Sequence, residues 1–333
     1  MTCYLCNEEL IGTNRTREHI IPGALGNNAV SETILCGRCN NGLASRIDAA
    51  FIRTYAYLYS LLQEARPDTN RKNKLTAKTK SGEEIEMAAG MVPYSQIEIV
   101  LPDGSIQKIS CPAGEEEAKI RKRLGQLKVK FPEIDVDKYI SNMQIEAKPI
   151  DELVYFSNYD TEHSIAGGPE FFRGIKKIAI NFYLSKGHDR RYINGIIYQV
   201  KHGKPGNEVL SKFYYPSIKP VHQLGEKEVS HIVKLVGNPD MGVLYCYVEL
   251  FNCNHVLILL NNHYDGPSID EQFCYDVLTS TYPEKDISLP VKNRDHIVDF
   301  FKLSTDTNAA GDAAYRRTRR ILEEEIRLKG QIK

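Results

Sequence analysis

Residues 16–28, TREHIIPGALGNN, place an acid and a histidine side by side just before a turn. Glu18 and His19 are either polar residues of a loop beside a strand or the working groups of a catalytic site. Successive side chains of a strand point to opposite faces, so both can reach one site only where the chain bends. Pro22, Gly23 and Gly26 supply turn-forming residues directly after the pair. The flanking sequence decides between the two interpretations.

Two C-x2-C pairs bracket this stretch: Cys3 with Cys6, and Cys36 with Cys39. A C-x2-C turn directs two thiolates at one ion, and two such turns complete a tetrahedral zinc site. The chain shows no secretory leader, and in a reducing compartment this spacing favours a metal over disulfides. Four thiolates leave no open position, so the predicted Zn²⁺ is structural. Core positions are expected for the remaining cysteines, Cys111, Cys246, Cys253 and Cys274.

The order of "CYLC", "EHIIP" and "CGRCNN", followed by Ile47-Asp48, resembles the zinc-containing HNH endonucleases, and in particular the subgroup with an E-H-x-x-P-x-x-L-G signature. The resemblance covers about residues 3–51. It implies a ββα-metal unit, in which two strands and a helix surround a catalytic metal ion. The strands are expected in residues 14–22 and 31–36.

The resemblance also implies residue roles. His19 matches the general base that activates the attacking water. Glu18 matches the acidic ligand of a catalytic Mg²⁺ or Mn²⁺ ion, and Asn40 matches its second ligand, at the start of the helix.

Two positions near this pattern carry open questions. Ser31 stands where the family usually has an Asn or His that braces the loop, and Asn27 or Asn28 could replace it. Asp48 is either a further polar residue of the catalytic site or an acid on the surface of a helix.

Lys plus Arg equals Asp plus Glu, 43 each, so the chain as a whole gives no evidence for nucleic-acid binding. Any contact with nucleic acid must come from local clusters. The candidates are Arg15, Arg17, Arg38 and Arg46 around the motif, Arg316, Arg317, Arg319 and Arg320 in a C-terminal helix, and, more weakly, Lys176, Lys177, Lys186, Arg190 and Arg191. The alternative for all of them is ordinary solvated surface.

The remaining sequence predicts a mixed α+β protein, with residues 1–66 as the HNH domain and residues 67–333 as a larger region that selects a target, binds a partner or senses a ligand. Apolar spacing predicts a helix from Leu43 to Pro67. Further expected elements are a linker or loop at 65–84, a hairpin at 95–110, helices at 115–131, 169–187 and 313–333, and two adjacent strands at 243–261.

Together these patterns predict a metal-dependent endonuclease that hydrolyses DNA. A role in defence against foreign DNA is the expectation for a free-standing nuclease of this kind, and a mobile-element or repair role is the alternative. RNA cleavage is one alternative, and a catalytically inactive zinc module that binds nucleic acid is another. No apolar run reaches the length of a membrane span, so we expect no membrane contact and a cytoplasmic location. The sequence leaves open a homodimer or an accessory protein as a partner.

Overall fold

A computed structural model describes residues 1–66, 75–79, 84–87, 94–112, 114, 116–141, 153–156, 168–203, 211–215, 220–289, 291, 294–296 and 308–330. The chain divides into two compact units. The first joins Met1–Ala65 to Ser164–Lys333, and the second is Arg66–His163. The first 65 residues therefore fold together with the C-terminal half, whereas the sequence suggested a separate domain for them.

The N-terminal segment is built from short strands and a segmented helix. Strand β1 (Glu18–His19) pairs antiparallel with β2 (Val30–Ser31), and the 3-10 turn η1 (Gly23–Leu25) lies between them. The strands fall within or beside the predicted segments but comprise two residues each.

The predicted helix at 43–67 is longer and more divided than expected. It runs through α1 (Gly37–Leu43), a π-helical segment η2 (Ala44–Asp48), α2 (Ala49–Thr54) and α3 (Ala56–Ala65). Its apolar stripe is confirmed, since all of Ile47, Phe51, Tyr55, Leu58 and Leu62 are buried. The break falls at Tyr55, where ψ is 7° and the amide bonds to Ile52 and Arg53 carbonyls instead of continuing the helix.

A five-stranded antiparallel sheet forms the centre of the first unit. Its strands are β8 (Ser211–Phe213), β9 (Ser230–Asn238), β10 (Val243–Leu250), β11 (Asn254–Asn261) and β12 (Ile269–Asp276), in the order β12-β9-β10-β11-β8. The predicted strand pair at 243–261 is thus confirmed as β10 and β11, joined at Phe251–Cys253, where Phe251 and Asn252 have positive φ angles. Every residue of β10 is buried, because both faces of the sheet are covered.

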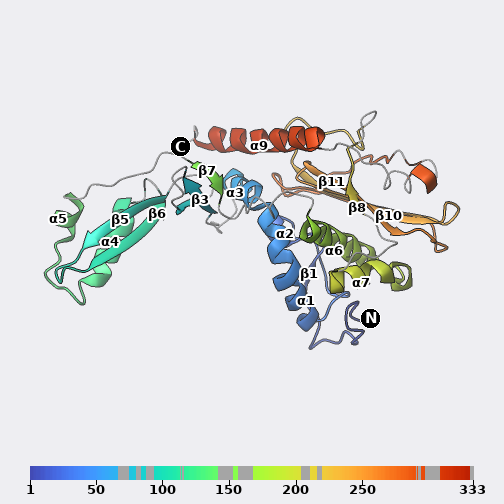
Figure 1. Cartoon of the computed structure of the whole chain (residues 1–333), viewed down its shortest axis with the longest axis horizontal. Helices are drawn as coiled ribbons and strands as arrows, with labels where there is room; N and C mark the ends of the chain where they lie inside the picture. Colours follow the sequence, from blue (N-terminus) through green and yellow to red (C-terminus); the bar gives the residue numbers. More distant parts are fainter. Residues whose placement is uncertain are drawn as a thin grey trace. The chain divides into compact units, whose positions relative to one another are not determined.

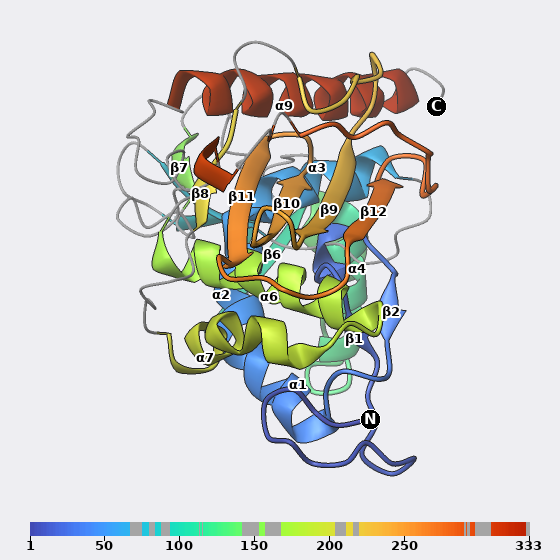
Figure 2. The same cartoon turned by 90° about the vertical axis from the view of Figure 1, so that its right-hand side faces the viewer.

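Helices cover this sheet from several sides. Helix α6 (Pro169–Ser185) packs across β9, β10 and β11, and α7 (Asn194–His202), which follows the 3-10 turn η5 (Arg190–Ile193), packs on α6 (Figures 1 and 2). Helix α9 (Asn308–Gly330) contacts α3 and β11. The side chains of the opposite sheet face, including Tyr245, Tyr247, Leu257 and Leu259, pack against Val221 and Ile287.

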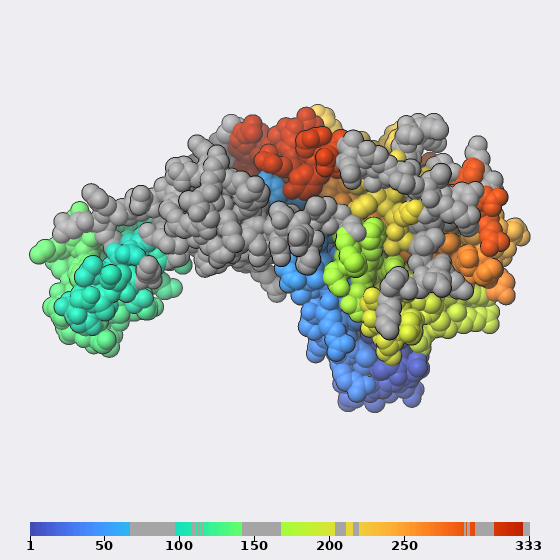
Figure 3. Space-filling view, viewed as in Figure 1, coloured from blue at the N-terminus to red at the C-terminus, as the bar shows by residue number. Residues whose placement is uncertain are grey.

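Helix α6 also packs on the N-terminal helices. A methyl group built on Gly174 would lie 2.3 Å from the ring of Phe51, so the two helices touch where only glycine leaves room. The ring of Phe171 packs at a tilt with its centroid 5.8 Å from that of Phe51, and the ring of Tyr55 lies 5.4 Å from that of Phe251 in the β10–β11 turn. In the space-filling view the blue N-terminal segment adjoins the yellow-green surface of α6 and α7 (Figure 3). This shared aromatic core makes one unit of two segments that are far apart in sequence.

The second unit has its own small core. Strands β4 (Glu84–Met87), β3 (Leu75–Thr79) and β7 (Leu153–Phe156) form one sheet, in that order, and β5 (Tyr94–Val100) and β6 (Ile106–Pro112) form the predicted hairpin. Helix α4 (Glu116–Leu127) confirms the expected helix, and α5 (Val136–Ser141) follows it. Strand β3 lies inside the stretch expected to be a linker, because its pairing with β4 and β7 overrides its polar composition.

Among the described helices, none combines the length and the apolar character needed to cross a lipid bilayer.

Candidate functional site

The four motif cysteines converge at the N-terminal end of the molecule. The thiol sulfurs of Cys3, Cys6, Cys36 and Cys39 all lie within 4.8 Å of one another. The sulfurs of Cys6 and Cys36 are 3.7 Å apart, far longer than a disulfide. A tetrahedral site with Zn–S bonds of about 2.3 Å has sulfurs about 3.8 Å apart, so the four thiols fit a structural zinc ion.

Local backbone geometry builds this cluster. Asn7 adopts a left-handed φ of 64°, and its amide donates to the Cys3 carbonyl, which closes the turn of the first pair. The Asn40 amide donates to the Cys36 carbonyl at 2.9 Å, so the second pair opens helix α1. Burial raises the pKa of the Cys6 thiol, but hydrogen bonds from the Glu8 backbone and the other three thiols outweigh it and lower this pKa to about 7. One thiol of the cluster therefore ionises readily, as metal binding requires.

Glu18 and His19 point to opposite faces of β1, as their adjacent positions dictate. The Glu18 side chain is buried, whereas His19 is half-buried. The ring of His19 lies over Gly23: a methyl group at Gly23 would come within 2.7 Å of its Nε2. The turn glycine thus leaves the space that the imidazole occupies.

The imidazole of His19 is open to a reactant. Within the described residues, neither ring nitrogen makes a hydrogen bond. Burial lowers the pKa of His19; the negative charge of Glu18 opposes this shift, and the positive charges of Lys177 and Arg17 add to it. The ring is therefore neutral near pH 7 and can accept a proton.

Asn40 lies on the first turn of α1, directly after the last cysteine. Its side-chain amide donates to the hydroxyl of Thr16 at 3.2 Å and to the carbonyl of Arg17 at 3.5 Å. Because the NH₂ group of Asn40 donates to these residues just before β1, its amide oxygen is left to accept a hydrogen bond or to bind a metal ion.

The carboxylate of Glu18 faces helix α6. Lys177 reaches the Glu18 Oε1 at 2.8 Å and the Asp48 Oδ2 at 2.6 Å, and the side chains of Lys177 and Glu18 are 4% and 5% exposed. A lysine of the C-terminal half thus neutralises two acids of the N-terminal segment inside the protein. Of the two interpretations of Asp48, the structure supports the polar neighbour of the site.

A second α6 residue completes this contact. Asn181, one turn beyond Lys177, donates to the Glu18 Oε1 at 2.8 Å and to the His19 carbonyl at 3.0 Å. Its own oxygen accepts from the Tyr4 hydroxyl at 3.2 Å. Asn181 was not among the residues predicted for the site, and Lys177 was predicted only as a nucleic-acid contact. Their spacing of four residues beside buried isoleucines was the available signal.

The central sheet supports the loop that follows His19. His231 of β9 is fully buried; its Nε2 contacts the Leu25 carbonyl at 2.9 Å, and its Nδ1 accepts from the Phe251 amide at 3.1 Å. The Nε2 therefore carries the hydrogen. Burial lowers the pKa of His231 to about 4.

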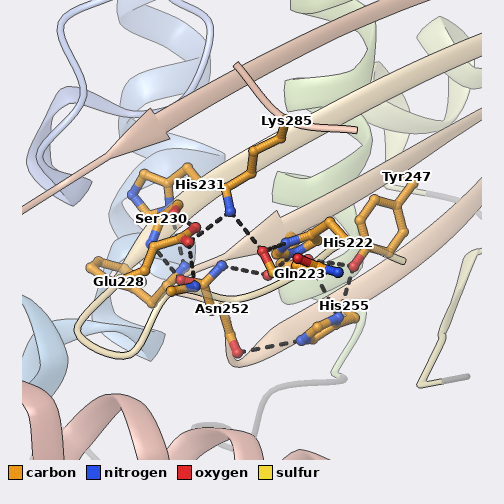
Figure 4. Close-up of polar contacts among 12 residues, drawn as sticks. His222, Gln223, Glu228, Ser230, His231, Tyr247, Asn252, His255 and Lys285 are labelled. Atoms are coloured by element: carbon orange, nitrogen blue, oxygen red, sulfur yellow. Dashed lines mark hydrogen bonds and ion pairs between the residues drawn. The ribbon is translucent and has the colours of Figure 1, made fainter. Parts of the chain in front are cut away.

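His231 lies at the edge of a larger buried polar cluster on the sheet (Figure 4). At its centre Glu249, fully buried, accepts from His222 at 2.9 Å, Asn252 at 2.6 Å and the Tyr247 hydroxyl at 2.5 Å. Burial raises the pKa of Glu249, but the charge of His255 and the contacts of His222 and Asn252 lower it to about 2. These side chains satisfy one another, so the cluster holds the strands and the 220–228 loop together.

Ser31 replaces the Asn or His that usually supports this loop, and the contacts of Ser31 and Asn27 show what supports it here. Ser31 contacts the hydroxyl of Thr33 at 3.0 Å. Asn27 is fully buried, and its side-chain oxygen accepts from the Ala29 amide at 2.8 Å. Asn28 is exposed. Of the two proposed substitutes, Asn27 is therefore the one whose side chain makes a contact within the loop between β1 and β2.

The arginines predicted to contact nucleic acid differ in how far they are engaged within the protein. Arg15, Arg17, Arg38 and Arg46 are exposed near the motif, with Arg17 and Arg38 in loose ion pairs to Glu32 and Glu8 at 3.9 and 3.6 Å. In α9, Arg317 donates to the carbonyls of Gly225 and Glu228, Arg319 pairs with Glu323 at 2.7 Å, and Arg320 lies 3.9 Å from Glu324. Arg316 is exposed. Much of the C-terminal cluster is thus engaged within the protein.

Comparison with known proteins agrees with this geometry. Residues 3–56 match the family model of the HNH endonucleases. The resemblance inferred from the motifs is confirmed over that segment, which indicates a nuclease. No curated protein and no solved structure matches the chain significantly.

The two residues predicted to bind a catalytic ion through oxygen differ in how many of their side-chain atoms already have partners. Glu18 gives its Oε1 to Lys177 and Asn181, while Asn40 keeps its oxygen free. Among the described residues, the cysteine cluster is the one grouping of three or more His, Cys, Asp or Glu side chains placed to share an ion. Lys177 and Asn181 hold the Oε1 of Glu18, so a divalent ion shared with Asn40 would have to bind the Glu18 Oε2.

Proposed function

We propose that the chain is an endonuclease that hydrolyses DNA phosphodiester bonds, with His19 as the general base. The observation that supports this proposal best is the half-buried imidazole of His19, which is free of hydrogen bonds among the described residues and lies against Gly23, in the segment that the two cysteine pairs bracket. A neutral imidazole in this position accepts a proton from water as the oxygen attacks phosphorus.

The surrounding residues have defined parts in this proposal. Asn40 offers its free amide oxygen, and the exposed Arg15, Arg17, Arg38 and Arg46 offer charge to the phosphates. A requirement for Mg²⁺ or Mn²⁺, with Glu18 and Asn40 as ligands, stays a prediction. Glu18 would bind the ion through its Oε2, because Lys177 and Asn181 hold its Oε1.

The first prediction concerns His19. His19→Ala should lower the cleavage rate by roughly a hundredfold to ten-thousandfold, because a general base contributes that much. Plasmid DNA and structured RNA, each with Mg²⁺ or Mn²⁺, are the substrates, and zinc content and circular dichroism check the fold. The matched control is His263→Ala, which removes an exposed histidine after β11.

The outcomes separate the candidate functions. Cleavage of DNA that His19→Ala abolishes and His263→Ala preserves supports the proposal. Cleavage of RNA alone would show that the chain is an RNA nuclease with the same general base. Binding without cleavage in any metal would identify an inactive zinc module.

The predicted cytoplasmic location, the role in defence against foreign DNA and the pairing with a second copy or an accessory protein belong to the same proposal and need cellular and solution tests.

A further inference from the structure

One side of the second unit carries a basic hollow between helix α4 and strand β6. It has a volume of about 360 Å³, and its lining consists of Gln107, Ile109, Lys119, Lys122, Arg123 and Gln126. Four of these residues come from α4 and two from β6. We call this group the basic hollow. It contains cations, amides and one isoleucine, and no acidic side chain lines it.

The core of the second unit fixes the basic hollow in place. Ile120 and Leu124 of α4 are fully buried against Ile97, Ile99 and Cys111 of the hairpin. Helical spacing then sets residues 119, 122, 123 and 126 along a neighbouring side of α4. The hollow is therefore a fixed surface on a packed element.

Arg123 organises the polar groups within it. Its guanidinium donates to the Gln107 Oε1 at 3.2 Å and to the Gln126 Oε1 at 3.1 Å, which links α4 to β6. Because both amide oxygens face the arginine, both amide NH₂ groups are left to donate elsewhere. The hollow thus offers donors and cations to a ligand.

Its charge is not balanced by neighbouring acids. Lys119 and Lys122 are exposed and have no ion-pair partner among the described residues. Residues 116–131 contain six Lys or Arg and two Asp or Glu, in a chain whose total net charge is zero. Of those two acids, Glu117 pairs with Arg121 at 2.8 Å, outside the hollow.

We propose that the basic hollow binds the phosphodiester backbone of nucleic acid. The assignment of this ligand rests on the proposed nuclease function. Phosphate oxygens are acceptors that match unpaired lysines and amide donors. With a helical rise of 1.5 Å, residues 119–126 extend over about 10 Å, which spans roughly three phosphates of one strand at 3.4 Å of axis each. A polyanion therefore fits this row of donors better than a single phosphate does.

The test measures binding directly, with no divalent ion added. The probe is a short fluorescent DNA duplex, titrated with the full chain over a series of salt concentrations. Lys119→Gln with Lys122→Gln should weaken binding roughly tenfold and reduce the salt dependence by about two counterions, because two phosphate contacts are lost. The matched control, Arg121→Gln with Lys138→Gln, removes the same charge from residues outside the hollow and should bind as the unmodified chain does.

Each outcome decides between the hollow and the nuclease assignment. Equal losses in both variants would indicate a general charge effect and overturn the proposal. If DNA is cleaved but neither variant changes binding, the nuclease function is supported and the proposal that the basic hollow binds nucleic acid is wrong. If no cleavage is detected yet the first variant alone loses binding, the hollow stands without the nuclease. Polyglutamate that binds the hollow when DNA does not would assign it to an acidic protein instead, and the proposal fails.

Discussion

The imidazole of His19 rests on Gly23, and this contact determines where its Nε2 lies. Gly23→Ala introduces a methyl group that would come within 2.7 Å of that nitrogen, so the ring must turn away. We predict a loss in cleavage rate of roughly tenfold to a hundredfold, because small displacements of a catalytic group cost that much. Zinc content and unfolding midpoint should change little, since the ring can move without the backbone.

Gly42→Ala provides the control for this variant, because a methyl group there meets no atom within 4 Å. It should cleave as the unmodified chain does. Full activity in Gly23→Ala would show that the position of the His19 ring does not limit the reaction.

Helix α6 joins the two halves of the first unit through one buried ammonium group. Lys177→Met leaves Glu18 and Asp48 without their cation in a region of low exposure. We predict a loss of roughly 3–5 kcal/mol in the free energy of unfolding, because an unpaired buried charge costs that much. Urea unfolding followed by circular dichroism measures it.

The neighbouring residue of the same helix is the control. Lys176 contacts Gln199 at 2.8 Å instead of the motif acids, so Lys176→Met should cost much less. Adding Asp48→Asn to Lys177→Met should restore part of the lost stability, since it removes one of the orphaned charges. Equal stability of Lys176→Met and Lys177→Met would show that the buried pair contributes nothing specific.

At the scale of the whole molecule, the central sheet supports the loop after His19 through His231. In the folded chain the pKa of His231 falls to about 4, below its ordinary value of 6.5. Between these values the unfolded state binds more protons, so stability falls as pH falls through this window. From about pH 7.5 to about pH 5 the loss from this residue should be roughly 2 kcal/mol.

His231→Gln isolates this effect, because a glutamine can donate to the Leu25 carbonyl and accept from Phe251 without titrating. The unfolding free energy of the unmodified chain minus that of His231→Gln should fall by that amount between the higher and the lower pH. His222 acts in the opposite sense. Burial lowers its pKa, but the larger effect of Glu249 leaves this pKa above its ordinary value. The stabilisation by His222 is therefore lost as pH rises. Its contribution cancels in the comparison. A difference that does not depend on pH would contradict the prediction.

The local sequence determined those features that depend on short-range geometry. The spacing of Cys3, Cys6, Cys36 and Cys39 was enough to predict the thiol cluster, because each C-x2-C turn forms within a few residues. Apolar periodicity likewise predicted α4, α6 and the β5–β6 hairpin, where Gly104 takes the positive φ angle that its turn requires. The motif order also predicted the match of residues 3–56 to the HNH endonucleases.

Only the tertiary structure decided what surrounds the motif. Lys177 and Asn181 lie 159 and 163 positions from Glu18, and no local pattern predicts that they contact its carboxylate. The same holds for His231 and the Leu25 carbonyl, and for the aromatic core that joins Phe51 to Phe171. Such contacts arise when two segments bury their apolar faces together, and burial then forces each polar group to find a partner that the chain order does not specify.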